Sequence, residues 1–372
     1  MRERGIYAGT GVSFALGANH TVSAGLEWRD GEYRNEKTKI ENGADKSDAK
    51  DRFTIDETRQ IFYLQDEWRI SDAHGLTPGI RVERTARESR DSADTSRKKD
   101  LVGTMPSLHY RWALQEDLNL RASVAKSVKL PKYDELNPFI KLESGVYKGG
   151  NPDLKPETAV GYELGLEQYF WGNRGIVGVN VYRRDVEDFV QKEQRVEGGL
   201  NVERPYNVGE AMFWGAELDW RVPLLRNGPH ELSLTGNHSE MRGRVKVAGV
   251  AGSSEVKDMP RRMSNIGLDW LHRPTMWSAG ININHQPRFT TNGINADGVR
   301  EVKTREQQTL LDLYVGWAAS SMAELRLIAK NVLAVDKEER TVKYTAAGAF
   351  SSDEWKRERS SPMVMMTLES RF

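Results

Sequence analysis

The sequence predicts an all-β protein, folded as a transmembrane antiparallel β-barrel. About fifteen runs of residues alternate between apolar and polar side chains, which is the pattern of β-strands with one apolar and one polar face. The connections between these runs alternate between short turns and long polar segments, as they do in bacterial transmembrane barrels. Several tryptophans stand near the short-turn ends of the runs, where such barrels carry an aromatic girdle. A soluble β-sandwich gives no reason for this order of connections.

The composition is compatible with that fold and argues against several others. The chain has 372 residues, no cysteine, and 54 basic against 54 acidic side chains, so its charge gives no reason to expect nucleic acid as a partner. The sequence contains no apolar stretch long enough for a transmembrane helix. Barrel strands need only about 9–11 residues, half of them polar, so the low mean hydropathy of −0.65 does not exclude a membrane.

The predicted strands are typified by the run 277–286. There Trp277, Ala279 and Ile281 alternate with Ser278 and Gly280. In chain order the strands are expected at residues 6–17, 21–33, 61–70, 76–84, 106–114, 118–128, 159–170, 176–185, 214–222, 232–238, 266–271, 277–286, 311–317, 325–331 and 364–372.

The connections lie at regular positions between these strands. Short turns are expected near residues 18, 72, 116, 173, 227, 273 and 320, and long polar loops near 42, 92, 142, 195, 248, 295 and 345. The tryptophans expected in the girdle at the short-turn ends are Trp28, Trp68, Trp112, Trp171, Trp270, Trp277 and Trp317.

One long loop, residues 129–156, ends in a distinctive string. It reads Asn151, Pro152, Asp153, Leu154, Lys155, Pro156, Glu157 and Thr158, and it leads into a Gly-x-Glu-x-Gly strand. Two prolines in five residues forbid a helix or a central strand here, so a rigid extended segment feeds the strand. The string resembles the signature of TonB-dependent outer-membrane receptors. Further segments at 63–68, 106–130, 207–217 and 330–337 are similar to landmarks of that family in the same order.

The resemblance implies a function and a cellular location. Family members take up a scarce, bulky ligand across the outer membrane of Gram-negative bacteria, most often a ferric siderophore, with energy from the TonB complex acting through a plug domain. The expected partners are therefore an iron–siderophore or similar chelate, the TonB complex, outer-membrane lipid and lipopolysaccharide, and the barrel assembly machinery. The terminal Phe372 resembles the assembly signal, although Ser370 departs from it.

Two features of the family are not recognisable in the sequence. Receptor barrels have roughly 22 strands and a plug, whereas about fifteen strands and no plug are predicted here. Residues 1–372 are therefore expected to be a single domain, the C-terminal portion of a receptor barrel, arising as a fragment, a truncated reading frame or a misannotated start. A passive porin-like channel, a non-functional receptor fragment and a soluble or surface-attached all-β binding protein are the alternatives.

The sequence contains no arrangement that indicates catalysis, and neither an enzyme activity, a cofactor nor a metal site is expected. The lumen is expected to be lined by Arg111, Arg121, Lys126, Glu163, Glu167, Glu217, Asp219 and Arg326. Aromatic and cationic groups suit an anionic, ring-bearing chelate, and on this ground the proposed substrate-binding residues are Tyr133, Phe139, Tyr147, Lys148, Arg288 and Phe289.

Overall fold

The computed structural model describes residues 2–36, 38, 40–45, 52–91, 96–137, 139–143, 145–295, 297–320 and 322–370. The regular structure of this part of the chain is almost entirely β, with one 3-10 turn at Asp134–Leu136. No helix in these residues is long and apolar enough to cross a membrane. Phe372, the predicted assembly signal, lies outside the described residues.

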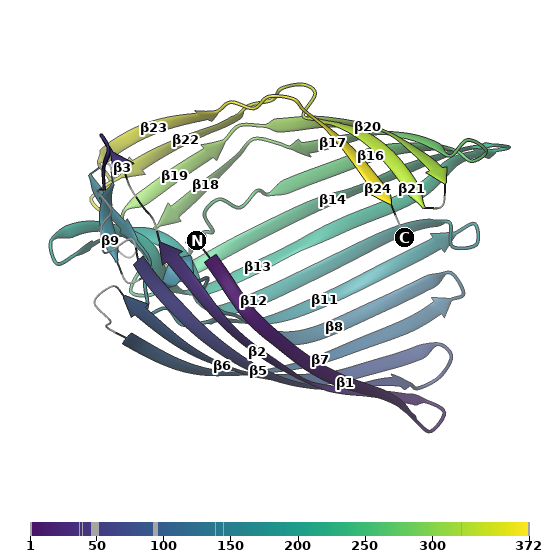
Figure 1. Ribbon diagram of the computed structural model, residues 1–372, viewed down its shortest axis with the longest axis horizontal. Helices are drawn as coiled ribbons and strands as arrows, with labels where there is room; N and C mark the ends of the chain where they lie inside the picture. Colours follow the sequence, from purple (N-terminus) through teal and green to yellow (C-terminus); the bar gives the residue numbers. More distant parts are fainter. Residues whose placement is uncertain are drawn as a thin grey trace.

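Fifteen strands pair one after another in antiparallel fashion and form a curved wall (Figure 1). β1 and β24 form its two edges and each pairs with one neighbour among the described residues. This arrangement confirms the antiparallel barrel-type sheet and the predicted number of strands. The strands are β1 (Arg2–Leu16), β2 (His20–Glu36), β5 (Arg52–Arg69), β6 (His74–Asp91), β7 (Ser96–Gln115), β8 (Leu118–Lys129), β11 (Glu157–Phe170), β12 (Gly175–Glu197), β13 (Leu200–Asn227), β14 (His230–Val247), β16 (Arg262–His272), β17 (Trp277–Gln286), β20 (Gln308–Ser320), β21 (Ala323–Lys330) and β24 (Met363–Ser370).

The outer face of the wall is an apolar belt. Leu164 lies opposite Val181 in the register of β11 and β12, and these side chains are 47% and 44% exposed. Ile281 on β17 is likewise 41% exposed. Large apolar side chains presented outward on strand after strand are costly in water but are the contact surface that a bilayer requires. The opposite face of the same strands is polar.

An aromatic girdle borders the belt at the short-turn ends of the strands. Trp277 stacks on Trp317 with ring centroids 5.9 Å apart, and His20 stacks on Trp68 at 5.4 Å. Trp28 was predicted in the same girdle, but it lies eight residues further along β2 than His20, roughly 26 Å away. Because barrel strands are tilted by about 35–45°, this path spans roughly 20 Å of the membrane, most of the height of the apolar belt, so Trp28 belongs to the opposite boundary.

Two segments predicted as loops are in fact continuations of strands. β6 and β7 remain paired as far as Arg90 opposite Ser96, and β12 and β13 as far as Glu197 opposite Leu200. Beyond the membrane a strand needs no apolar face, and charged side chains stabilise it by pairing across the hairpin, as Lys98 does with Glu88 at 3.6 Å. Because these extensions are rich in charged residues, they lack the apolar–polar alternation from which strands were predicted.

The long connections also contain further strands, at the end of the wall opposite the short turns (Figure 1). Segments 287–307 and 331–362, predicted as loops, contribute a four-stranded sheet. Lys303 within this sheet pairs with Asp258 and Glu339, both at 2.9 Å. The four-stranded sheet consists of β18 (Phe289–Ile294), β19 (Arg300–Arg305), β22 (Lys337–Tyr344) and β23 (Phe350–Glu358). The other strands in the connections are β3 (Ile40–Glu41) and β4 (Ala44–Asp45), which pair with each other, and β9 (Ile140–Glu143), β10 (Val146–Gly149) and β15 (Ser254–Glu255), which join the main sheet.

The buried core of the described chain lies at this long-loop end. One cluster gathers Val186, Tyr206, Val208, Ala211, Val245, Val247 and Val256. A second gathers Tyr33, Phe53, Ile55, Leu136 and Leu154. The second cluster joins residues of β2 and β5 to the loop that carries the signature, and it therefore fixes the position of that loop.

Candidate functional site

The inner face of the wall is lined by charged and amide side chains. Glu163 and Glu167 on β11 face the same side as Asp219 on β13, because successive odd residues of a strand share one face. Lys126 was predicted on this face as well. It points to the outer face instead, because it is an odd number of residues away from the lumen-facing Arg121 on β8.

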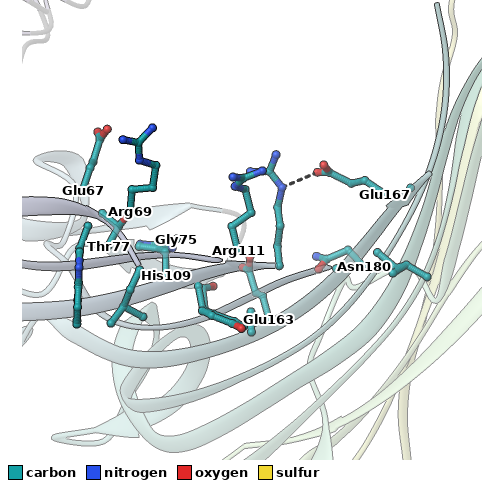
Figure 2. Close-up of a pocket in the computed structure, with 18 of the residues that line it drawn as sticks. Glu67, Arg69, Gly75, Thr77, His109, Arg111, Glu163, Glu167 and Asn180 are labelled. Atoms are coloured by element: carbon teal, nitrogen blue, oxygen red, sulfur yellow. Dashed lines mark ion pairs between the residues drawn. The ribbon is translucent and has the colours of Figure 1, made fainter. Parts of the chain in front are cut away.

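A cavity of about 820 Å³ lies on this inner face near the short turns (Figure 2). Arg69, Arg111 and Arg121 line it together with acidic side chains of β5, β11 and β13. His109 also lies here (Figure 2). Within the described residues no group of three or more histidine, aspartate or glutamate side chains is arranged to hold a metal ion.

The charges of this cavity are only partly paired with one another. Arg121 Nε lies 3.0 Å from a carboxylate oxygen of Glu167, the pair that is dashed in Figure 2. Arg111 lies directly opposite Arg121 in the register and donates to the amide oxygen of Asn119 at 3.4 Å. Among the described residues Arg111 and Glu163 have no ion-pair partner. The cavity therefore offers both an unpaired cation and an unpaired anion to whatever fills the lumen.

A ladder of ion pairs runs along the inner face of β2, β5 and β6, from the side of this cavity toward the long-loop end. It was not anticipated from the sequence, although the alternating acidic and basic residues of these strands were a signal for it. Its contacts are Arg81 with Glu27 (4.0 Å) and Glu83 (3.2 Å), Arg59 with Glu83 (3.3 Å) and Glu57 (2.8 Å), and Arg87 with Glu57. Arg87 and Glu57 are both buried, and Arg87 also donates to the carbonyl of Pro131 at 2.9 Å. The ladder thus ends by holding the start of the signature loop.

The end of the same loop is held by the signature itself. The Asn151 side chain accepts from the backbone N–H of Asp153 at 3.0 Å and donates to the carbonyl of Pro205 on β13 at 3.1 Å. The backbone N–H and carbonyl of Lys155 bond the side-chain amide of Asn207 at 2.9 and 3.0 Å. Two family-like segments some fifty residues apart in the sequence therefore meet in one contact.

Leu154 and Glu157 complete this attachment. Leu154 is 1% exposed within the second core cluster, and its carbonyl accepts from the Lys99 ammonium at 3.0 Å. The buried carboxylate of Glu157 accepts from the backbone N–H of Val190 at 2.7 Å and pairs with Lys129 at 2.9 Å. We call this set of contacts by Asn151, Leu154, Lys155 and Glu157 the signature clamp.

Tyr133, one of the predicted substrate-binding residues, belongs to the attachment of the loop. Its ring stacks on Tyr33 with centroids 4.9 Å apart, and the Arg87 guanidinium lies 5.2 Å from its centre. Its hydroxyl donates to Glu57 at 3.2 Å. Burial, reinforced by the Glu57 charge, raises the pKa of Tyr133 to about 12. The phenol therefore stays neutral and acts as a hydrogen-bond donor at neutral pH.

The other predicted residues divide between two elements. Tyr147 and Lys148 lie on β10, which pairs in parallel with Val202 and Glu203 of β13, and Lys148 is exposed. Phe139 is half-buried just before β9. Arg288 pairs with Glu306 at 3.4 Å and Phe289 is 6% exposed at the start of β18, so the structure places these two on a separate element from the β9–β10 hairpin.

Sequence reasoning missed a third group at the mouth. On the β12–β13 hairpin the Arg195 guanidinium lies 3.8 Å from the centre of the Tyr206 ring, and Arg204 pairs with Glu197 at 2.7 Å. Arg195 also pairs with the buried Glu193 at 2.9 Å. These charges satisfy one another, so the cluster stiffens the hairpin.

The antiparallel wall has an apolar outer belt, two aromatic boundaries and a polar inner face. These features define an outer-membrane β-barrel of the transport class. Residues 3–332 match the family described as TonB dependent receptor-like, beta-barrel. The chain belongs to that family, whose members are receptors and transporters of the outer membrane of Gram-negative bacteria.

Individual relatives agree with this assignment. The chain is 23% identical over 328 residues to the iron-regulated outer membrane virulence protein of Vibrio cholerae, covering 84% of this chain and 45% of that protein. It is 25% identical over 300 residues to the ferrienterobactin receptor of Escherichia coli, covering 74% of this chain and 36% of that protein. The chain thus spans less than half the length of these curated relatives. Among solved structures, a ferric enterobactin receptor of Pseudomonas aeruginosa is similar in fold, with a TM-score of 0.63 and 19% identity over 100% of this chain and 54% of that one.

Proposed function

We propose that residues 1–372 form one domain, the C-terminal portion of a receptor barrel that imports a ferric siderophore across the outer membrane. The observation that carries the proposal is the combination of an outward apolar belt with a charged inner face in a chain of this family. Relatives named as receptors for ferric enterobactin support an iron chelate as the substrate. No catalytic step is part of this function.

Energy for uptake would come from the TonB complex through a plug domain that fills the lumen. The unpaired Arg111 and Glu163 support this part of the proposal, because charged groups on the wall can hold a soluble domain of complementary charge in the lumen. A passive porin-like channel would instead conduct without energised membranes.

Strand β10 of the β9–β10 hairpin, where Tyr147 is half-buried and Lys148 is exposed, is the best-supported place for ligand contact at the mouth. Backbone pairing with β9 and β13 holds Tyr147 and Lys148 there, and within the part of the chain that the structure describes Lys148 makes no ion pair. An aromatic ring beside an ammonium suits an anionic, ring-bearing chelate. Phe139, Arg288, Phe289 and Tyr133 remain proposed substrate-binding residues with weaker geometric support, since Phe289 and Tyr133 are largely taken up by packing.

The test is uptake of radiolabelled iron as ferric enterobactin by cells that carry the complete receptor. Uptake is expected to stop when the proton gradient is collapsed, and Tyr147→Ala with Lys148→Ala is expected to weaken binding about tenfold. Lys132→Ala, on the same loop and exposed, serves as the charge-matched control. Uptake that continues without a proton gradient would favour the passive channel and overturn the proposal.

A further inference from the structure

The ladder of ion pairs on the inner face of β2, β5 and β6 is one continuous chain in which acidic and basic groups alternate. Each carboxylate inside the chain contacts two guanidinium groups, so a member that moves leaves a charge that its neighbour must compensate. Followed contact by contact, its members are Arg29, Glu27, Arg81, Glu83, Arg59, Glu57 and Arg87. The chain therefore links the lumen beside Arg81 to the signature loop that Arg87 holds.

The two ends of the ladder differ in exposure. Arg87 and Glu57 are 7% and 8% exposed, whereas the side chain of Arg81 is 37% exposed on the inner face. Arg81 precedes Arg87 by six residues on β6, so the two lie roughly 20 Å apart along the strand. A group in the lumen can therefore reach Arg81, while the pair at the other end is covered by the loop.

Both guanidinium groups in the middle of the ladder lie closer to the carboxylate that follows them toward the loop. Arg81 is 3.2 Å from Glu83 and 4.0 Å from Glu27. Arg59 is 2.8 Å from Glu57 and 3.3 Å from Glu83. The reverse arrangement, with each guanidinium nearer to its other carboxylate, uses the same charged groups. The ladder thus has two alternative pairings, which is what a two-state element requires.

The middle of the ladder has both the space and the donor that the reverse arrangement needs. A cavity of about 630 Å³ borders Arg59, Glu83 and Arg87 and extends to Tyr133 of the signature loop. Arg59 Nε is buried and has no hydrogen-bond partner among the residues that the structure describes, although a carboxylate oxygen of Glu83 lies 3.3 Å away. This N–H is therefore available to bond Glu83 when Arg59 turns toward it.

We propose that the ladder is a relay through which an anionic group in the lumen loosens the start of the signature loop. A carboxylate that binds Arg81 draws it away from Glu83. Glu83 is then left with one guanidinium and takes Arg59 from Glu57. The inference rests on the proposed function only in that a domain of the complete receptor fills the lumen and supplies the carboxylate.

The last step of the relay acts on the loop. Once Arg59 has turned away, Arg87 is the one guanidinium of the ladder that still contacts Glu57. The Arg87 side chain is drawn toward that carboxylate and away from the carbonyl of Pro131, which it now contacts at 2.9 Å. The start of the loop thereby loses one of its attachments to the wall.

The test follows hydrogen–deuterium exchange of the Leu136 amide in the complete receptor. This N–H donates to the carbonyl of Tyr133 at 3.2 Å and closes the turn at the start of the loop, so its exchange reports on the opening of that turn. Glu324→Gln and Arg326→Gln are the matched controls, because these residues form an ion pair at 2.8 Å on β21 and do not belong to the ladder. Heat-modifiable migration verifies that each variant folds.

Two substitutions at the lumen end are expected to act in opposite directions. Arg81→Gln leaves Glu83 free to attract Arg59, so exchange at Leu136 should accelerate about threefold, a size typical of coupling through such networks. Glu27→Gln removes the carboxylate that competes with Glu83, so exchange should slow by a similar factor. General damage to the wall would accelerate exchange in both variants, and uncoupled ends would leave both unchanged. Either result overturns the proposal.

A second pair of variants tests the effect of an anion in the lumen. Tyr63 lies directly opposite Arg81 in the register, so Tyr63→Glu places a carboxylate beside that guanidinium, and Tyr63→Gln is the neutral variant of the same size. Exchange at Leu136 is expected to be about threefold faster in Tyr63→Glu than in Tyr63→Gln. Equal exchange in these two variants also overturns the proposal, and they decide the question alone if Arg81→Gln does not fold. None of these measurements uses uptake, so a failed transport test would leave them unaffected.

Discussion

The side-chain amide of Asn207 is predicted to keep the signature loop closed against β13. It accepts from the Lys155 N–H at 2.9 Å and donates to the carbonyls of Lys155 at 3.0 Å and Asp188 at 2.7 Å. Asn207→Ala removes all three bonds. Each is worth about 1 kcal/mol net, but water can reach this half-exposed site, so the expected loss is about 2 kcal/mol of local stability. That loss corresponds to a roughly 30-fold larger population of the open loop.

The assay is hydrogen–deuterium exchange of the complete receptor, followed in peptides that span residues 150–158. The Lys155 amide reports directly, because its hydrogen bond is one of those removed, and its exchange should accelerate about 30-fold. Asn265→Ala is the matched control, since that amide bonds Asn237 and Asn284 on the wall and does not touch the loop. Unchanged exchange at Lys155 in a folded Asn207→Ala receptor would show that the clamp is not what holds the loop.

Three further predictions concern the same loop and the girdle. Glu157→Gln should speed exchange of the Val190 amide about tenfold, because a neutral amide accepts less strongly than a buried carboxylate; no change would contradict the assigned hydrogen bond. The pKa of Tyr133 is raised to about 12, so the stabilisation linked to its neutral phenol is fully present below the unfolded pKa near 10 and is lost as the pH rises through 12. In a titration followed by phenolate absorbance, the receptor should show one tyrosine that ionises near pH 12 and that is missing from Tyr133→Phe. If the missing tyrosine instead ionises near pH 10, the burial of Tyr133 is refuted. Trp317→Ala should cost about 1 kcal/mol of unfolding free energy in lipid vesicles and shift the emission of Trp277 to longer wavelength, whereas unaltered emission would place these rings outside the girdle.

The fold was predictable to the extent that the membrane imposes a pattern on the sequence. Within the bilayer one face of each strand must be apolar, and residues 277–286 show that alternation without interruption. Outside the bilayer that requirement ends. The paired extensions of β6–β7 and β12–β13 were therefore assigned to loops, although their charged residues pair across the hairpin.

Two residues were assigned to the wrong place because their distance along the strand from a residue of known position was not taken into account. Lys126 was assigned to the lumen by its charge, whereas its distance from Arg121 along β8 already places it on the outer face. Trp28 was assigned to the short-turn girdle by its residue type, whereas its distance from His20 places it at the other boundary. For Lys126 the period-2 alternation gives the correct face, and for Trp28 the rise per residue along the strand gives the correct boundary; in both cases the residue type misled.

The candidate site was less predictable, because its contacts join segments that are distant in the sequence. Tyr133 carries the aromatic and polar character expected of a ligand contact, yet Tyr33, Glu57 and Arg87 occupy that surface. Only the register of β2, β5 and β6 reveals these neighbours.

The signature itself can now be explained by its contacts. Its prolines keep the chain extended, Asn151 and Lys155 bond β13, Leu154 fills the second core cluster, and Glu157 reaches β12. Every polar group in this account holds backbone or another strand and none points to a free site. The signature therefore acts as a fixed rim from which the β9–β10 hairpin extends across to β13. This geometry supports the proposal that residues of that hairpin, and not the string that identifies the family, contact the ligand.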